Sequence, residues 1–238
     1  MENNNFGKLY LIPTTLGDNE PLEVLPISIK RAIENIDYYI VENEKTARRF
    51  IKKISSKKSQ GDLVIEALNK FTEPEMIPTF LQPCLEGKNV GVISEAGCPG
   101  VADPGADVVR IAHEKNIKVV PLVGPSSILL ALMASGLNGQ NFAFNGYLPI
   151  EASERKAAIK KLEKLSKDTK QSQLFIETPY RNDKLFSELI KSLNTFTKVC
   201  IACDITLPTE FIDTKTVKEW SQEKLELHKR PTIFIIQA

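Results

Sequence analysis

The sequence predicts an α/β protein with a mainly parallel sheet in its N-terminal half and a mixed sheet in its C-terminal half. Three observations support this prediction. Short apolar runs alternate with segments of helical spacing over the first 135 residues. Glycine- and proline-rich loops follow three of those runs. In the second half, helices alternate with strands that are able to pair antiparallel.

The expected strands of the N-terminal half are short apolar runs, as is typical of strands buried on both faces. They cover residues 9–12, 38–41, 63–68, 89–94 and 118–122. The expected helices between them carry apolar residues at three- and four-residue spacing. They cover residues 22–36, 45–54, 74–85 and 105–115, and a further helix follows Gly124-Pro125-Ser126 to about Ser135. Pro26 lies early in the first of these helices, where proline is tolerated best, so one continuous helix is expected there.

In the C-terminal half, the expected strands cover residues 142–148, 174–177, 198–204, 210–213 and 232–237. The expected helices cover residues 153–168, 181–194 and 215–223. The change in character between the halves predicts a domain boundary near residues 120–126. We therefore expect one domain over residues 1–122 and a second over residues 123–238.

Composition narrows the class of protein further. The 238 residues are 42% apolar and 26% charged, which is ordinary for a globular protein, and the formal net charge is +1. No apolar stretch approaches the ~18–20 residues that span a bilayer, and the N-terminus does not resemble a signal peptide. We expect a cytoplasmic protein with no membrane partner. Cys200 and Cys203 are expected to be buried strand thiols, because a zinc site needs about four ligands; no metal site is predicted.

Three loops after expected strands carry the chemistry. They cover residues 13–18, 94–105 and 123–127. Ligands of open α/β sheets bind outside the carboxyl ends of the strands, and glycine lets backbone groups approach a ligand closely. Each loop taken alone is explained by a simple turn, whereas three together favour a common binding site. The chain contains neither a phosphate-binding P-loop nor the dinucleotide G-x-G-x-x-G pattern after its first strand.

Five motifs resemble the tetrapyrrole (corrin/porphyrin) methylase superfamily. They are LYLIPTTLGD, VISEAGCPGVADPG, VPLVGPSS with ALMASGL, FAFNGYLP and LFIETPYR, in the order typical of that superfamily. The family pattern S-D-A-G-T-P-x-x-S-D-P-G matches residues 94–105 at seven of its ten specified positions, and the changes are Glu95, Cys98 and Ala102. The motifs are most similar to the branch that 2′-O-methylates a cytidine of small-subunit ribosomal RNA.

The resemblance implies a two-domain tetrapyrrole-methylase-like fold that binds S-adenosylmethionine in a cleft between the domains, and a homodimer. By motif, the cofactor-binding residues are Leu16, Glu95, Ala96, Gly97, Val101, Ser126, Ser127, Glu177 and Thr178. The resemblance further implies ribosomal RNA or the small ribosomal subunit as partner.

Two regions depart from the ribosomal branch, which usually has E-D-T-R after the second strand. Here that strand is followed by Glu42, Asn43, Glu44 and Lys45, and a later stretch keeps Asn69 without the usual histidine. Methyl transfer to a ribose hydroxyl is helped by a general base within ~3 Å. The catalytic candidates are Glu42, Asn43, Glu95 and Asp103, although an amide such as Asn43 only orients an acceptor. Asp103 is also expected to cap the helix that begins near Gly105.

Charge is locally uneven. Seven basic side chains lie between residues 45 and 58, and Lys45, Arg48, Arg49 and Lys52 share one helix face, which makes them candidate RNA contacts. A second basic group lies over residues 155–170, where interleaved acids favour a solvated helix face. The sequence therefore predicts an S-adenosylmethionine-dependent methyltransferase that acts on RNA. Two alternatives stay open: methylation of a tetrapyrrole or other small molecule, and a cofactor-binding module without catalysis.

Overall fold

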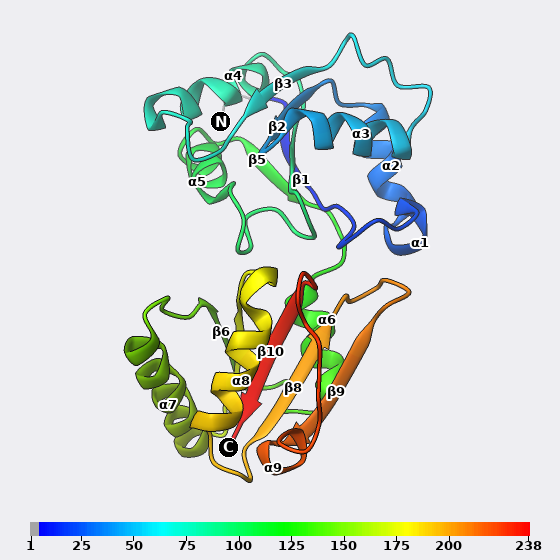
Figure 1. Ribbon diagram of the computed structural model, residues 1–238. Coiled ribbons are helices and arrows are strands. Elements are labelled where there is room, and N and C mark those ends of the chain that lie inside the picture. The colour runs from blue at the N-terminus through cyan, green and yellow to red at the C-terminus, as the bar shows by residue number, and fades with distance from the viewer. Residues whose placement is uncertain (1–4) are drawn as a thin grey trace. The chain divides into compact units, whose positions relative to one another are not determined.

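The chain forms two compact units in a computed structural model that describes residues 5–238 (Figure 1). The first unit ends at Ser126, and the second covers Ser127–Ala238. The functional division expected between residues 122 and 123 stays a prediction.

The first unit is built on a parallel sheet of five strands in the order β3-β2-β4-β1-β5, which confirms the expected sheet. The strands are β1 (Lys8–Ile12), β2 (Tyr38–Val41), β3 (Val64–Ala67), β4 (Val90–Ile93) and β5 (Lys118–Pro121). Successive side chains of β1 enter opposite faces, so Leu9 and Ile12 belong to different apolar clusters. Because all five strands are parallel, their carboxyl ends lie at one edge of the sheet.

Helices cover both faces of this sheet (Figure 1). On one face lie α1 (Pro21–Val24), α2 (Ile27–Glu34) and α3 (Glu44–Ile54), whose apolar sides pack on Ile12, Tyr39 and Ile93. On the other lie the 3₁₀ helix η1 (Pro74–Leu81), α4 (Gln82–Leu85) and α5 (Ala106–Glu114). The central strands β2 and β4 are therefore buried between the helices, whereas the edge strand β3 is largely exposed, and loops collect at the carboxyl edge of the sheet.

Three expected helices differ from the structure, and proline explains two of them. The third, expected over 215–223, is the four-residue helix α9 (Val217–Trp220), because Lys215 and Thr216 still belong to a strand. The expected helix over 22–36 is two helices, because Leu25 and Pro26 adopt extended backbone angles between α1 and α2. A residue before proline disfavours the helical region, so the break falls at Leu25. The expected helix over 74–85 is the 3₁₀ segment η1 followed by one short turn, since Pro74, Pro78 and Pro83 interrupt regular helical hydrogen bonding.

The second unit holds a mixed five-stranded sheet in the order β6-β7-β10-β8-β9, which confirms the expected mixed pairing. Its strands are β6 (Phe142–Tyr147), β7 (Ser172–Ile176), β8 (Lys198–Cys203), β9 (Phe211–Thr216) and β10 (Thr232–Gln237). Only β6 and β7 pair in parallel; the other neighbours are antiparallel. Cys200 and Cys203 are buried thiols on β8.

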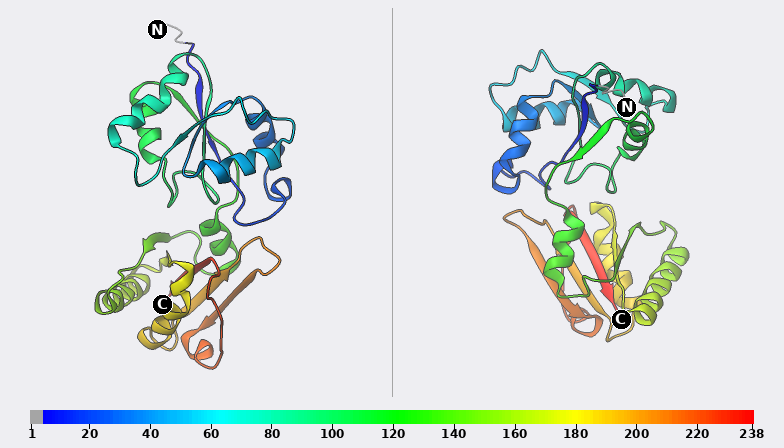
Figure 2. Two further views of the ribbon diagram at one scale, coloured as in Figure 1. Left: turned by 45° about the horizontal axis from the view of Figure 1, so that its top comes forward. Right: turned by 180° about the vertical axis from the view of Figure 1, so that it is seen from behind.

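Helix α6 (Ser127–Ser135) packs against β8, β9 and β10, and the remaining helices cover the opposite face (Figure 2). These are α7 (Ala152–Thr169), the short η2 (Pro179–Arg181), α8 (Asn182–Ser192) and α9 (Val217–Trp220). Trp220 anchors this face, because its buried indole N–H donates to the Val199 carbonyl at 2.9 Å. No helix within residues 5–238 is both long and apolar enough to cross a membrane.

Candidate functional site

The three glycine- and proline-rich loops of the first unit meet at Gly97. Its carbonyl accepts a hydrogen bond from the Thr14 N–H at 2.9 Å and another from the Ser94 hydroxyl at 2.6 Å. The next residue, Cys98, places its sulfur 3.4 Å from the Pro125 carbonyl oxygen. Gly97 therefore joins the loop after β4 to the loops that follow β1 and β5.

Backbone geometry explains why a glycine occupies this junction. Gly97 has a φ of +77°, which side chains of L residues rarely adopt. A Cβ at this position would lie 3.1 Å from Leu16 Cδ2 and 3.1 Å from the Pro125 carbonyl oxygen. Beside the junction, Leu16 is half-buried and Val101 is 51% exposed. The junction thus offers bare backbone bordered by apolar side chains, which suits an adenosyl group that carries both a flat ring and polar atoms.

Asp103 does not cap a helix, and the expectation that it would is wrong. Helix α5 begins at Ala106, so Gly105, with a φ of +130°, is its N-cap residue. No side chain forms a capping hydrogen bond with the first turn of this helix. Burial raises the pKa of Asp103 to about 6, with repulsion from Glu42 as the next cause, although the nearby backbone of Glu95 partly opposes the shift. A carboxylate with this pKa accepts a proton readily near neutral pH.

Glu42 and Asn43 follow β2, and Glu42 lies close to Asp103. Glu42 and Asp103 line the same recess of about 10 Å³, roughly the room of one water molecule. The Asn43 side chain caps α3, since its Oδ1 accepts from the N–H groups of Lys45 and Thr46 at 2.9 and 3.2 Å. Asn43 therefore has a clear structural task at the start of the helix.

Glu95 connects the loop after β4 to helix α3. Its Oε1 accepts a hydrogen bond from the Thr46 hydroxyl at 2.6 Å. Thr46 was not among the residues predicted for the site. Its signal in the sequence is weak, because a threonine in the first turn of a helix is ordinary, and the contact with Glu95 spans 49 residues.

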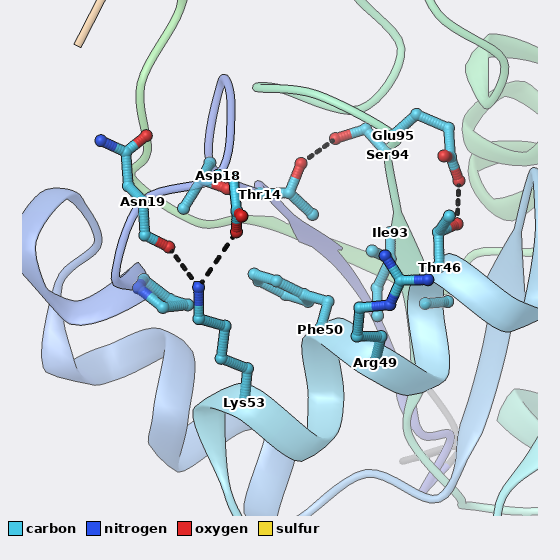
Figure 3. Close-up of a pocket in the computed structure, with 13 residues that line it drawn as sticks. Thr14, Asp18, Asn19, Thr46, Arg49, Phe50, Lys53, Ile93, Ser94 and Glu95 are labelled. Carbon is cyan, nitrogen blue, oxygen red and sulfur yellow. Dashed lines mark hydrogen bonds and ion pairs between the residues drawn. The ribbon is translucent and has the colours of Figure 1, made fainter. Parts of the chain in front are cut away.

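A pocket of about 130 Å³ opens between α3 and the loops after β1 and β4 (Figure 3). Arg49 and Lys53 extend into it from successive turns of α3, with the Phe50 ring between them (Figure 3). Lys53 donates to Asp18 at 3.3 Å and to the Asn19 carbonyl at 2.8 Å, so it fixes the loop after β1. The pocket combines cationic, aromatic and hydroxyl groups at the carboxyl edge of the sheet.

The four predicted RNA contacts on α3 divide into two kinds. Arg48 donates to Glu44 at 2.7 Å and to the Gln60 carbonyl at 2.6 Å, and so holds the segment that leads to β3. Arg49 is exposed and forms no ion pair with any residue from 5 to 238. Lys45 and Lys52 are also exposed. Arg49 is therefore the arginine of α3 that is available to a ligand.

In the second unit, Glu177 and Thr178 follow β7, and Ser127 begins α6. The Glu177 carboxylate is buried and accepts from the Arg181 guanidinium and from the Thr178 N–H, each at 2.6 Å. Burial alone would raise the pKa of Glu177, but these donors outweigh it and hold the pKa below its usual range. Glu177 is thus an ionised anchor for the turn that carries Thr178.

Within the described chain, no group of three or more histidine, cysteine, aspartate or glutamate side chains is arranged to hold a metal ion. The candidate site of the first unit consists of the Gly97 junction, the carboxylate of Asp103 and the pocket that Arg49 enters.

Comparison with known proteins places these features in context. The family "Tetrapyrrole (Corrin/Porphyrin) Methylases" matches residues 8–220. Curated relatives named "Ribosomal RNA small subunit methyltransferase I" include one from Escherichia coli O157:H7, 26% identical over 99% of this chain and 79% of the relative. One from Vibrio cholerae is 27% identical over 97% of this chain and 77% of the relative.

Solved structures show the same fold. The methyltransferase CobJ superposes with a TM-score of 0.63 at 15% identity and covers 97% of this chain and 94% of its own. The cobalt precorrin-4 methyltransferase CbiF gives a TM-score of 0.58 at 18% identity, with the same coverage of both chains.

Proposed function

This chain belongs to the tetrapyrrole (corrin/porphyrin) methylase family, and from that premise we propose that it methylates a ribose 2′-hydroxyl of small-subunit ribosomal RNA. It is a methyltransferase, and its methyl donor is S-adenosylmethionine. The observation that carries the RNA substrate is the match to curated ribosomal RNA methyltransferases over nearly the whole chain. The structural likeness to enzymes of precorrin chemistry reflects the fold alone, because the identity is below 20%.

The junction at Gly97 is the proposed centre of cofactor binding in the first unit. Its missing Cβ leaves room beside Leu16 and Pro125, and its apolar border suits an adenosyl group. The proposed cofactor residues of this unit are Leu16, Glu95, Ala96, Gly97, Val101 and Ser126. In the second unit we assign Ser127, Glu177 and Thr178 to the same task, with Glu177 acting through its hold on the turn.

The chemistry demands little beyond placement and one proton acceptor. Bound S-adenosylmethionine supplies an electrophilic methyl group for an in-line displacement. Among the four carboxylate and amide candidates, Asp103 suits the role of general base best, because its pKa of about 6 keeps it ionised yet basic near neutral pH. With the cofactor bound, Asp103 would take the proton of the ribose hydroxyl as that oxygen bonds to the methyl carbon, while the bond from the methyl carbon to sulfur breaks and the sulfur leaves as a neutral thioether. Arg49 is placed to bind an adjacent phosphate.

A methyl-transfer assay with radiolabelled S-adenosylmethionine tests this function. Purified small ribosomal subunits, the naked ribosomal RNA and a tetrapyrrole are offered as separate acceptors. We expect label in the ribosomal RNA, at a nucleotide that resists alkaline hydrolysis because its 2′-oxygen is methylated. Label only in the tetrapyrrole would replace the RNA substrate with a small molecule.

We also propose that the protein acts as a homodimer in the cytoplasm, where its ribosomal substrate is found. Exposed apolar side chains of the second unit support a dimer, notably Met133 on α6 and Tyr147 on β6. Light scattering coupled to gel filtration measures the mass directly. A mass of one chain at micromolar concentration would contradict the dimer.

A further inference from the structure

A basic groove runs along helix α7 of the second unit, and none of the residues assigned to cofactor binding lines it. It has a volume of about 520 Å³ and lies between the C-terminal half of α7 and the loop that precedes β8. Lys160, Lys164, Lys167 and Lys170 line its helical side. The exposed ring of Phe196 lines the opposite side. The groove thus places an aromatic ring opposite a row of ammonium groups.

The positive charge of the groove is largely uncompensated. Lys160 pairs with Glu163 at 2.9 Å. Lys164, Lys167 and Lys170 form no ion pair with any residue that the structure describes, the chain's last residue included. Lys160, Lys164 and Lys167 follow one another at three- and four-residue spacing, so they project from one face of α7, and Lys170 is the residue that caps the end of this helix. An anionic ligand along this face would meet several ammonium groups in succession.

Glu163 lines the groove, but its carboxylate is bonded to the neighbouring loop and does not face an incoming ligand as a free charge. Its carboxylate is 8% exposed and accepts from the Asn194 N–H at 2.6 Å and from the Thr197 hydroxyl at 2.7 Å. Burial alone would raise the pKa of Glu163, but these donors and Lys160 outweigh it and hold the pKa below its usual range. Glu163 is therefore ionised, and its carboxylate holds the loop in place by accepting hydrogen bonds from Asn194 and Thr197.

That fixed loop holds Phe196 out of the core. The Phe196 N–H donates to Asn194 Oδ1 at 3.0 Å, and Asn194 and Thr197 are both tied to Glu163. The Phe196 ring is 77% exposed, although an apolar side chain of this size gains free energy from burial. A rigid loop that keeps an aromatic ring in solvent beside lysines is the arrangement that single-stranded nucleic acids bind, through phosphate contacts and base stacking.

We propose that this groove binds a single-stranded segment of the RNA substrate, with phosphates at Lys164, Lys167 and Lys170 and one base stacked on Phe196. The proposal rests on the proposed RNA methyltransferase function and adds a second contact with RNA, because the groove belongs to the second unit and Arg49 belongs to the first. An acidic peptide would satisfy the lysines but has no need of an exposed aromatic platform. The groove therefore serves affinity for the substrate and takes no part in methyl transfer.

Binding of a fluorescein-labelled, single-stranded RNA of twelve nucleotides tests the groove, measured by anisotropy from 50 to 300 mM salt. The double variant Lys164→Gln with Lys167→Gln should bind more weakly and lose about 1.4 from the slope of log affinity against log salt, about 0.7 for each lysine. The control is Lys218→Gln with Lys224→Gln, which removes two exposed lysines of the same unit outside the groove. The control should keep the affinity of the wild type.

Phe196 supplies an independent arm. Phe196→Ala should weaken binding about 5- to 150-fold with little change in the salt slope, because stacking is not ionic. Phe196→Trp should restore the affinity, since it keeps a flat ring. Unchanged affinity and slope in both the lysine and the alanine variants would overturn the proposal, as would binding of an acidic peptide in place of RNA.

Methylation assays separate this proposal from the proposed function. In the groove variants, KM for ribosomal RNA should rise while kcat at saturating RNA and the affinity for S-adenosylmethionine stay those of the wild type. A wild-type protein that binds the RNA through this groove but does not methylate ribosomal RNA would contradict the function and leave the groove standing. A wild-type protein that methylates ribosomal RNA with unchanged KM in the groove variants would contradict the groove alone.

Discussion

Asp103 and Glu42 line one small recess of the first unit, so their two carboxylates lie close enough to repel each other. Burial and the repulsion from Glu42 and Glu95 outweigh the opposing effect of the Glu95 backbone, and the pKa of Asp103 rises from 3.8 to about 6. Between pH 4 and pH 6, the folded protein therefore still holds a proton on Asp103, whereas the unfolded chain has already released it. The stability that this proton contributes is lost as the pH rises through that window.

Replacement of Asp103 by asparagine should therefore stabilise the protein at neutral pH. Asparagine keeps the size and a polar oxygen of the side chain but carries no charge to repel Glu42. After allowance for the half-exposed position, we expect a gain of about 1 kcal/mol at pH 8 that disappears below pH 4. Urea unfolding at both pH values measures the difference. An equal effect at pH 4 and pH 8 would show that the charge of Asp103 is not its cause.

The same variant should lose methyl-transfer activity. If Asp103 takes the proton of the acceptor hydroxyl, Asp103→Asn should lower kcat by about 10²- to 10⁴-fold. In the wild type, kcat should fall as the pH drops through about 6, because the carboxylate becomes protonated. Initial rates from pH 5 to pH 9 give the profile. A wild-type profile that stays flat across pH 6, or a variant with full activity, would assign the proton to another group.

A side chain at Gly97 should abolish binding of S-adenosylmethionine. Valine at this position would strain a backbone with a φ of +77° and would press on Leu16 and the Pro125 carbonyl. Isothermal titration calorimetry should detect no binding by Gly97→Val up to millimolar ligand. Gly139→Val is the matched control, since a Cβ at Gly139 meets no atom within 4 Å, and it should bind as the wild type does.

Strain alone could also disturb the fold of Gly97→Val, and Leu16→Ala answers that concern. This variant removes a half-buried apolar contact beside the junction without changing the backbone. We expect it to keep the thermal unfolding midpoint within a few degrees while it weakens cofactor binding by roughly fivefold, about 1 kcal/mol. Undiminished affinity in Leu16→Ala would move the cofactor away from this junction.

The sequence sufficed to predict the sheets and the meeting of the loops, because both follow from chain-wide rules. Short apolar runs mark parallel strands, and the carboxyl ends of parallel strands share one edge, so the loops that contain Leu16, Gly97 and Pro125 had to approach one another. The orientation of Asp103 did not follow. Asp-Pro-Gly before a helix fits a cap, and only the start of α5 after Gly105, with no side-chain bond to its first turn, decides otherwise.

The break at Pro26 illustrates a different limit. The apolar spacing over residues 22–36 continues through the proline, so periodicity alone favours one helix. The structure instead places Leu25 and Pro26 in extended conformations, with Leu25 buried among the residues that α2 and α3 bring together. Local steric preference before proline outweighed the periodic pattern there.

Arg48 and Arg49 offer a final test, because neighbouring residues of equal charge have different tasks on α3. Arg48→Gln should destabilise the fold by about 1–2 kcal/mol, since it gives up the ion pair with Glu44 and the bond to the Gln60 carbonyl. Arg49→Gln should leave the stability unchanged but weaken RNA binding and lower its salt slope by about 0.7–0.9, as loss of one phosphate contact requires. Urea unfolding and RNA anisotropy measure the two effects. The control is Arg31→Gln, which removes an exposed arginine of α2 outside the pocket and should change neither the stability nor the RNA affinity. If Arg31→Gln and Arg49→Gln lost the same RNA affinity, Arg49 would contribute only through the overall positive charge of the protein and not through a specific phosphate contact.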